Sequence, residues 1–173
     1  MALVVEDGTI VADADSYVAL ADATAYHAAL GNSGWTGTDE VKEQALRKAT
    51  MFVDNRYGAR FKGTRVEKTQ SLAWPRSDVA DVDGFDVDDD EIPAALKKAV
   101  MEAALRVVQG TDLSPDLERG GDIKRTASAV GPISTEVEYM DGASRTTTFT
   151  MIEDLLRPVL NTSSGSTKFI ERA

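Results

Sequence analysis

The chain has 173 residues, 42% of them hydrophobic and only 6% aromatic, which is enough for one domain with a core of mainly Ala, Val and Leu. The absence of cysteine excludes disulfides, thiolate metal sites and a cysteine nucleophile. The net charge of −10 argues against a dedicated nucleic-acid binder.

Residues 1–15 are expected to form an extended N-terminal arm. Two short apolar runs flank Asp7-Gly8, a pair that favours a tight hairpin turn. There is no basic region followed by an apolar segment of secretory length, and no run approaches the length of a membrane span. We therefore expect a soluble protein without a membrane partner, made and used in the cytoplasm or in an assembly built there.

Two helices are predicted from apolar spacing in the next stretch. The first spans residues 16–30 and is closed by Gly31. It carries His27, the only histidine of the chain, which we interpret as a structural residue because neither a base nor a metal ligand is supported without partners. The second helix follows the N-cap Thr38 and ends at Gly58. Its apolar stripe comprises Val41, Ala45, Ala49, Phe52 and Val53.

Residues 55–79 form a segment that we call the basic arm. Its cations are Arg56, Arg60, Lys62, Arg65, Lys68 and Arg76. It ends near Trp74-Pro75, where proline restricts the backbone so that the ring is aimed in one direction, which suggests a structural anchor. Two interpretations stay open: a ring that plugs the core beneath solvated cations, or an ordered arm that meets a partner. Interleaved aromatic and basic side chains also suit weak binding of single-stranded nucleic acid.

Residues 77–91 hold eight acids and no base, which leaves −2 for the rest of the chain. These acids either pair with the basic arm of a neighbouring copy or form a solvated face. A calcium loop is a weaker alternative around Asp81 and Gly84, because the alignment puts Val79 at the first ligand position and Asp90 where a bidentate Glu belongs.

A third helix is predicted from Pro93, a residue suited to the first helical position, to Gly110. Its expected buried residues are Leu96, Val100, Ala103 and Val107. Its expected solvent-facing residues are Lys97, Lys98, Glu102 and Arg106.

Alternation over residues 133–139 predicts a strand, with a turn at Asp141-Gly142, a partner strand over residues 143–149, and residues 123–130 as a third candidate. Thr150 and Glu153 match a capping box that opens a short helix, which Pro158 kinks or ends. Residues 161–173 read as a flexible tail. The tail carries the apolar and basic patch Lys168, Phe169 and Ile170.

The sequence holds no phosphate-binding glycine loop, no pair of histidines for a metal and no motif around His27. The carboxylates cluster in one loop without a proposed substrate pocket. We therefore predict a protein that is not an enzyme and that needs neither cofactor nor metal.

Several runs in order resemble a known family. They are SYVALADATAYHAALG, FVDNRYGARFKG, TQSLAWPRSDV, IPAALKKAVMEAALR, PDLERGGDIKR, GPISTEVEY and DLLRPVL. Over about residues 14–160 the chain resembles the head-tail adaptor (connector) proteins of long-tailed bacteriophages, many of which are labelled putative DnaT-like single-stranded-DNA-binding proteins. Ala19 departs from this pattern, because Ser or Thr is common where the first helix opens.

The resemblance implies a mainly α fold: a bundle of three to four helices over residues 16–160 with a β-hairpin at about 123–149. It implies a ring of twelve copies in the virion neck under the portal, where the ring extends the channel for double-stranded DNA and meets the next neck or tail protein. The alternative is a single-stranded-DNA-binding replication accessory protein. Candidate contacts to a neighbouring subunit are Arg60, Lys62, Arg65, Asp86 and Asp88, and candidate portal-docking residues are Lys168, Phe169 and Ile170.

Overall fold

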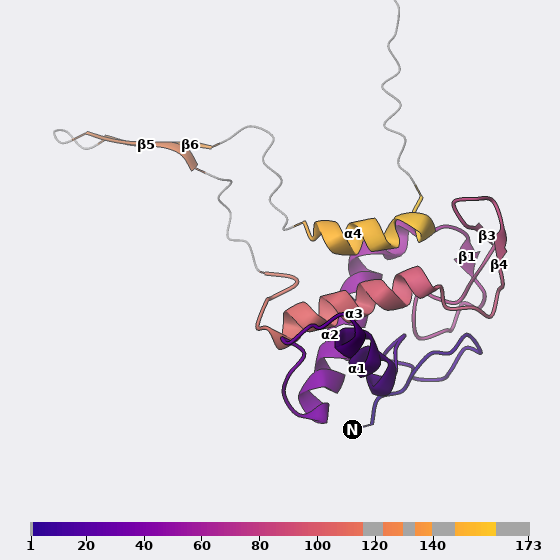
Figure 1. Cartoon of the computed structure of the whole chain (residues 1–173). Coiled ribbons are helices and arrows are strands. Elements are labelled where there is room, and N and C mark those ends of the chain that lie inside the picture. The colour runs from indigo at the N-terminus through magenta and orange to yellow at the C-terminus, as the bar shows by residue number, and fades with distance from the viewer. Residues whose placement is uncertain (1, 116–122, 130–133, 140–147, 162–173) are drawn as a thin grey trace, which may run out of the picture.

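The computed structural model describes residues 2–115, 123–129, 134–139 and 148–161, and these form a mainly helical protein (Figure 1). The helices are α1 (Leu20–Ala29), α2 (Asp39–Tyr57), α3 (Ala94–Val108) and α4 (Thr150–Leu156). Short 3-10 turns follow α2 (η1, Gly58–Arg60) and α4 (η2, Arg157–Val159). The predicted mainly α fold class is therefore confirmed.

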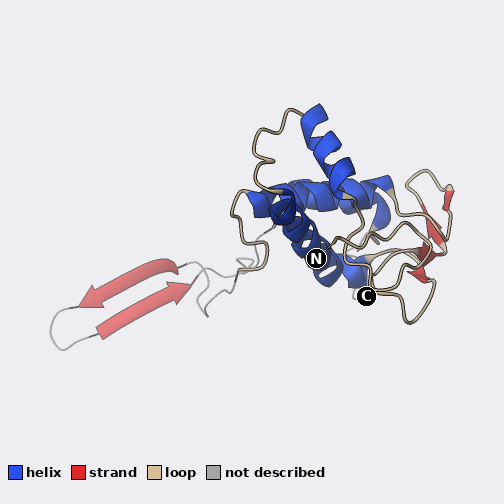
Figure 2. Cartoon of the chain, turned by 90° about the horizontal axis from the view of Figure 1, so that it is seen from below, coloured by secondary structure: helices blue, strands red, loops and turns tan. Residues whose placement is uncertain are grey.

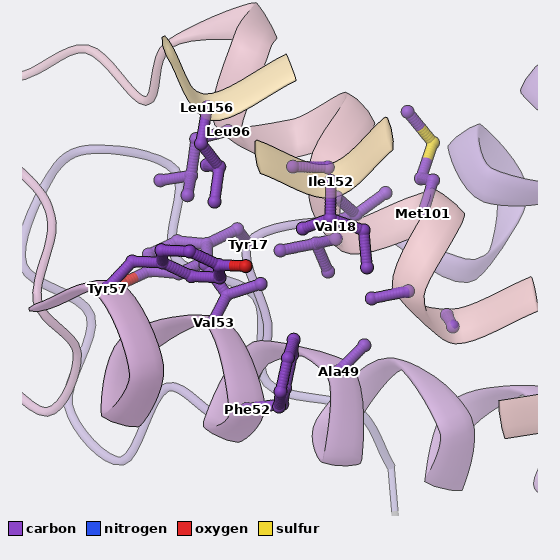
Figure 3. Packing of buried hydrophobic residues seen from close by; sticks show 14 of the residues in the cluster. Tyr17, Val18, Ala49, Phe52, Val53, Tyr57, Leu96, Met101, Ile152 and Leu156 are labelled. Atoms are coloured by element: carbon purple, nitrogen blue, oxygen red, sulfur yellow. The ribbon is translucent and has the colours of Figure 1, made fainter. Parts of the chain in front are cut away.

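The core lies where α3 packs between α2 and α4, and α1 covers part of α2. Figure 3 shows side chains from all three packed helices converging, among them Val53 of α2, Leu96 of α3 and Ile152 of α4. Many of the buried positions are alanines, including Ala49 and Ala103. Small side chains allow helices to approach closely, so few aromatic rings are needed to fill this core.

Three antiparallel strand pairs accompany the helices. β1 (Thr64–Arg65) pairs with β2 (Arg76–Ser77), and β3 (Val79–Ala80) pairs with β4 (Asp86–Val87). β5 (Ile123–Ala129) pairs with β6 (Ser134–Tyr139), and this hairpin lies apart from the helices in both views (Figures 1 and 2). The first two pairs lie together beside the end of α3 at which that helix begins (Figure 1).

The C-terminal hairpin is present, but its partner strand differs from the main prediction. β6 pairs with β5, the segment that was only a third candidate, so the chain reverses before β6 rather than after it. The predicted strand over 143–149 lies outside the described residues except for Thr148 and Phe149, which are not in a strand. Both candidate segments are short and neighbour β6 in sequence, and local pattern does not select the strand that pairs.

The predicted hairpin at Asp7-Gly8 is wrong. The loop instead wraps the buried carboxylate of Glu6, which accepts hydrogen bonds from the backbone N–H of Gly8, Ile10 and Val11 at 2.9–3.0 Å. Three donors directed at one carboxylate hold the loop more firmly than a two-residue turn would. Val5 then forms a parallel bridge with Ser16.

The helix starts are partly corrected. α1 begins at Leu20 rather than residue 16, because Ser16 Oγ is occupied by the backbone N–H and carbonyl of Val18. Thr38 caps α2 as predicted. Thr150 lies inside α4 and makes no capping hydrogen bond, so the capping box is wrong, whereas α4 does give way to a 3-10 turn at Pro158.

Two side chains lie on the opposite side from that predicted. Val41, expected in the buried stripe of α2, is exposed, and the buried residues of this helix begin at Ala45. Glu102, expected on the wet side of α3, is buried because the hydroxyl of Tyr26 donates to it at 3.3 Å and Arg106 lies 3.5 Å from its carboxylate. A buried carboxylate is tolerated when it has such partners.

Candidate functional site

The basic arm is fixed to the core at its C-terminal end. The Trp74 ring is 0% exposed and meets Phe61 edge-on, with ring centroids 5.9 Å apart, and the peptide bond to Pro75 is cis. Gln70 organises the preceding turn: its amide nitrogen donates to the carbonyls of Leu72 and Pro75, and its amide oxygen accepts from Glu67 N. The sequence reasoning missed Gln70, because a lone glutamine in a polar loop carries no pattern.

A buried network joins the arm to α2 and to the segment before α1. Asp54 accepts from the hydroxyl of Tyr17 and from the backbone N–H of Ala73, while the same hydroxyl accepts from Trp74 N at 3.1 Å. Burial raises the pKa of Asp54, and the hydrogen bonds from Ala73 and Tyr17 oppose that rise. Burial likewise raises the pKa of Tyr17 well above its ordinary value, followed by the nearby charge of Asp54. This network sets the position of the whole arm.

The cations of the arm divide into structural and exposed groups. Arg76 donates to three backbone carbonyls, those of Lys62 (2.7 Å), Gly63 (2.7 Å) and Ala73 (3.2 Å). Burial lowers the pKa of Arg76, and the neighbouring positive charge of Arg65 lowers it further. Arg76 is therefore part of the scaffold. Arg56, Arg65 and Lys68 are exposed.

Two of the three basic residues proposed to contact a neighbour have partners within the chain. Lys62 Nζ donates to the carbonyl of Ala80 at 2.9 Å. This bond connects the arm to residues 77–91, which we call the acidic segment. Arg60 is half exposed, lies 3.9 Å from the Glu153 carboxylate and stands over the Tyr57 ring. Arg65 on β1 is exposed and pairs across the ladder with Arg76. Of the three, Arg65 offers its charge most freely to another molecule.

The acidic segment borders an open depression of about 920 Å³. Asp86 and Asp88, the two proposed acidic contacts, are exposed and line it together with Asp78, Asp89 and Asp90. The N-terminal loop forms another part of its wall, where Gly8 approaches the Asp90 backbone so closely that an added Cβ would lie 1.7 Å from the Asp90 carbonyl oxygen. The basic arm and the acidic segment are thus neighbours at one end of the molecule, joined through β2 and β3.

This arrangement does not provide a stacking platform for nucleotide bases in the arm. Tyr57, Phe61 and Trp74, the three rings interleaved with its cations, are 1%, 2% and 0% exposed. Base stacking on aromatic side chains needs exposed ring faces. The depression beside the arm is lined by carboxylates, which repel phosphate.

Neither a metal-binding cluster nor a membrane-spanning helix is found in the part of the chain that the structure describes. No group of three or more His, Asp or Glu side chains there could hold a metal ion, so the described residues give no support to the predicted alternative of a calcium loop. No described helix combines the length and apolar character that a membrane span requires. Lys168, Phe169 and Ile170 lie outside the described residues.

The structure adds one surface feature that the sequence reasoning did not single out. Val82 and Phe85, at the tip of the β3–β4 hairpin, are 68% and 72% exposed. A signal for this tip existed in the sequence, because Asp followed three residues later by Gly is typical of a tight turn closed by a side-chain carboxylate. Val82 and Phe85 are isolated apolar residues in the acid-rich segment 77–91, so no apolar periodicity marks them.

Comparison with known proteins identifies the family of this chain. The family model described as "Putative DnaT-like ssDNA binding protein" matches residues 1–173. No curated protein and no solved structure matches this chain.

Proposed function

The chain belongs to the putative DnaT-like single-stranded-DNA-binding protein family, and we propose that it is a structural assembly protein, a head-tail adaptor in the neck of a long-tailed bacteriophage. In this role twelve copies of the chain form a ring between the portal and the next neck or tail protein. The ring extends the channel through which double-stranded DNA passes. The protein resides in the virion and, during assembly, in the host cytoplasm.

The observation that carries this proposal is the burial of all three aromatic rings of the basic arm beneath a surface of mixed charge. Heterologous assembly needs unlike patches on one protomer, and exposed Arg65, the acidic depression and the apolar tip at Val82 and Phe85 supply them. The projecting β5–β6 hairpin adds strand edges that suit pairing with another protein. The phage identity of the assembly is supported by the sequence resemblance over residues 14–160.

The carboxylate-lined depression also suits a channel protein. Carboxylates that face a DNA duplex repel its phosphates, so the duplex passes without being held. Under this proposal Asp86 and Asp88 either border the channel or contact a neighbouring subunit, and the protein performs no catalysis and uses no cofactor.

Single-stranded DNA binding is the second candidate function, and the family description favours it more directly than the adaptor role. Its cations would be the exposed Arg56, Arg65 and Lys68. Because the arm's rings are buried, such binding would rest on charge alone and would fall steeply with salt.

Two measurements separate the candidates. Negative-stain electron microscopy of the purified protein, with and without its portal protein, is expected to show ring-shaped particles that add density beneath the portal. Fluorescence anisotropy with a labelled single-stranded oligonucleotide is expected to show no binding at physiological salt. A monomer that ignores the portal and binds the oligonucleotide tightly, with binding lost in Arg65→Ala and Lys68→Ala, would establish the second function instead.

The proposed portal contact at Lys168, Phe169 and Ile170 has its own test. Deletion should begin at residue 162, because Asn161 N donates to the Arg60 carbonyl at 2.7 Å and its side chain donates to the Phe61 carbonyl. We expect the shortened chain to keep its thermal transition and to lose portal binding in a pull-down. Unchanged portal binding would remove these three residues from the proposal.

A further inference from the structure

The tip of the β3–β4 hairpin presents two apolar side chains in a fixed conformation. The Asp81 carboxylate accepts from the backbone N–H of Asp83 (2.8 Å) and of Phe85 (2.9 Å), and Asp81 N donates to the Phe85 carbonyl. Val82 and Phe85 are more than two-thirds exposed on this tip. A tip that is already ordered loses little conformational entropy on binding, which favours its use as a contact.

A groove lies at the C-terminal end of α3, the end at which Val107 stands. It has a volume of about 450 Å³ and is bounded by α2 on one side and by the chain that follows α3 on the other. Its apolar lining comes from Met51, Phe52, Val107 and Leu113. Met51 is 61% exposed, so part of this lining faces water. Pockets of this size accept small ligands or a few side chains.

Tip and groove are complementary in charge as well as in apolar character. Lys48 is exposed at the groove, and the tip carries the exposed carboxylate of Asp83 next to Val82. Asp112 also lines the groove, but its carboxylate accepts from Ser114 N at 2.9 Å within its own loop. An apolar tip with an acid beside it therefore fits an apolar groove with a lysine beside it.

We propose that the hairpin tip of one copy inserts Phe85 into the groove of a second copy, with Asp83 facing Lys48 of that copy. The 15 residues of α3 span about 22 Å. The β3–β4 hairpin lies beside the end at which α3 begins (Figure 1), whereas the groove is lined by Val107 and the residues after α3, so tip and groove do not meet within one protomer. After the first contact one copy keeps a free groove and the other keeps a free tip, and repetition gives a ring or a filament. This contact rests on the proposed assembly function and assigns residues to it.

Cysteine pairing tests the contact directly, because the chain has no cysteine of its own. Val82→Cys preserves Phe85, and Met51→Cys preserves the rest of the groove. We expect a mixture of the two variants to form a disulfide-linked dimer under mild oxidation faster than either variant alone. Val82→Cys mixed with Leu30→Cys is the matched control, since Leu30 is 54% exposed on α1's C-terminal cap and lies outside the groove. Equal rates in the two mixtures would overturn the proposal.

Sedimentation of single variants supplies a second readout. We expect Phe85→Ser to weaken self-association at least about tenfold, the loss typical of a central apolar anchor, and Leu30→Ser to leave it within about twofold. Lys48→Asp should weaken association, and Asp83→Lys in the same chain should restore it. A wild-type chain that stays monomeric at millimolar concentration overturns the contact.

The outcomes also separate this contact from the adaptor role. A chain that joins the portal ring but fails the cysteine pairing overturns the tip-to-groove contact and leaves the adaptor proposal standing. A chain that forms the disulfide-linked dimer but does not bind the portal supports the tip-to-groove contact and overturns the adaptor proposal. Pairing that appears only after residues 162–173 are deleted would assign the groove to the chain's own tail and overturn the proposal for the full-length protein.

Discussion

Tyr17 and Asp54 are joined by a hydrogen bond in which the tyrosine hydroxyl lies 2.8 Å from Asp54 Oδ1. The hydroxyl also accepts from Trp74 N, and Asp54 Oδ2 accepts from Ala73 N. Three segments far apart in sequence therefore share one buried polar cluster. This cluster fixes the C-terminal part of the basic arm to the core.

Tyr17→Phe tests the importance of this cluster. The change removes one donor to Asp54 and one acceptor from Trp74, and unsatisfied buried groups are costly, so we expect the free energy of unfolding to fall by about 1–3 kcal/mol. Tyr26→Phe is the comparison: its hydroxyl makes a longer bond of 3.3 Å to Glu102, which keeps Arg106 nearby. Urea denaturation of both variants measures the difference. Equal losses in the free energy of unfolding would show that the Tyr17 hydroxyl contributes no more to stability than the Tyr26 hydroxyl.

Arg76→Lys should destabilise the arm, whereas Arg65→Lys should not. A lysine cannot reach three carbonyls as the Arg76 guanidinium does, so we expect a loss of about 1–3 kcal/mol at position 76. The exposed Arg65 should change stability by less than about 0.5 kcal/mol. Urea denaturation measures both, and a near-neutral Arg76→Lys would show that the three bonds contribute little.

His27 should titrate below the ordinary histidine range. Burial lowers the pKa of His27, and the nearby charge of Glu102 opposes this shift only in part. Because the folded-state pKa lies below the unfolded value of 6.5, the unfolded chain binds more protons in the window between the two. Stability is therefore complete above pH 6.5 and is lost as the pH falls through that window.

The single histidine makes this measurement clean, since one imidazole signal in the proton NMR spectrum belongs to one residue. We expect its midpoint below 6.5, and urea denaturation should show a loss of stability from pH 7 to pH 5.5 that His27→Gln reduces. A midpoint at or above 6.5 would mean that Glu102 outweighs burial.

The sequence predicted those parts of the fold that depend on local spacing. α2 was predicted with its N-cap because the interaction is local: the Thr38 side chain accepts a hydrogen bond from Val41 N, three residues away. Its apolar residues also recur at helical spacing. The burial of Glu102 was missed because its partner Tyr26 is 76 residues distant. The pairing of β6 with β5 was predicted only as a third possibility, because strand alternation alone does not identify which neighbouring segment pairs.

The candidate site was harder to predict than the fold. Arg65 and Arg76 are the same residue type on paired strands, yet one is exposed and the other holds three carbonyls. Charge counting along the chain cannot separate them. Their difference is set by tertiary structure: the folded arm brings the carbonyls of Lys62, Gly63 and Ala73 around the Arg76 guanidinium.

Gly8→Ala tests whether the N-terminal loop is fixed against the acidic segment. Gly8 has a φ of +113°, and an added Cβ would lie 1.7 Å from the Asp90 carbonyl oxygen, so the loop must shift away from that wall of the depression. We expect a loss of more than about 1 kcal/mol, because alanine suits neither this φ nor this contact.

The matched control is Gly58→Ala, whose φ is −54° in the helical region and whose added Cβ meets nothing within 4 Å. There alanine should stabilise the protein by about 0.4–1 kcal/mol through the unfolded chain. Thermal and urea denaturation of the two variants should therefore move in opposite directions from the wild type. If Gly8→Ala were as stable as the wild type, the N-terminal loop would not be held against Asp90, and the depression would lack the wall described above.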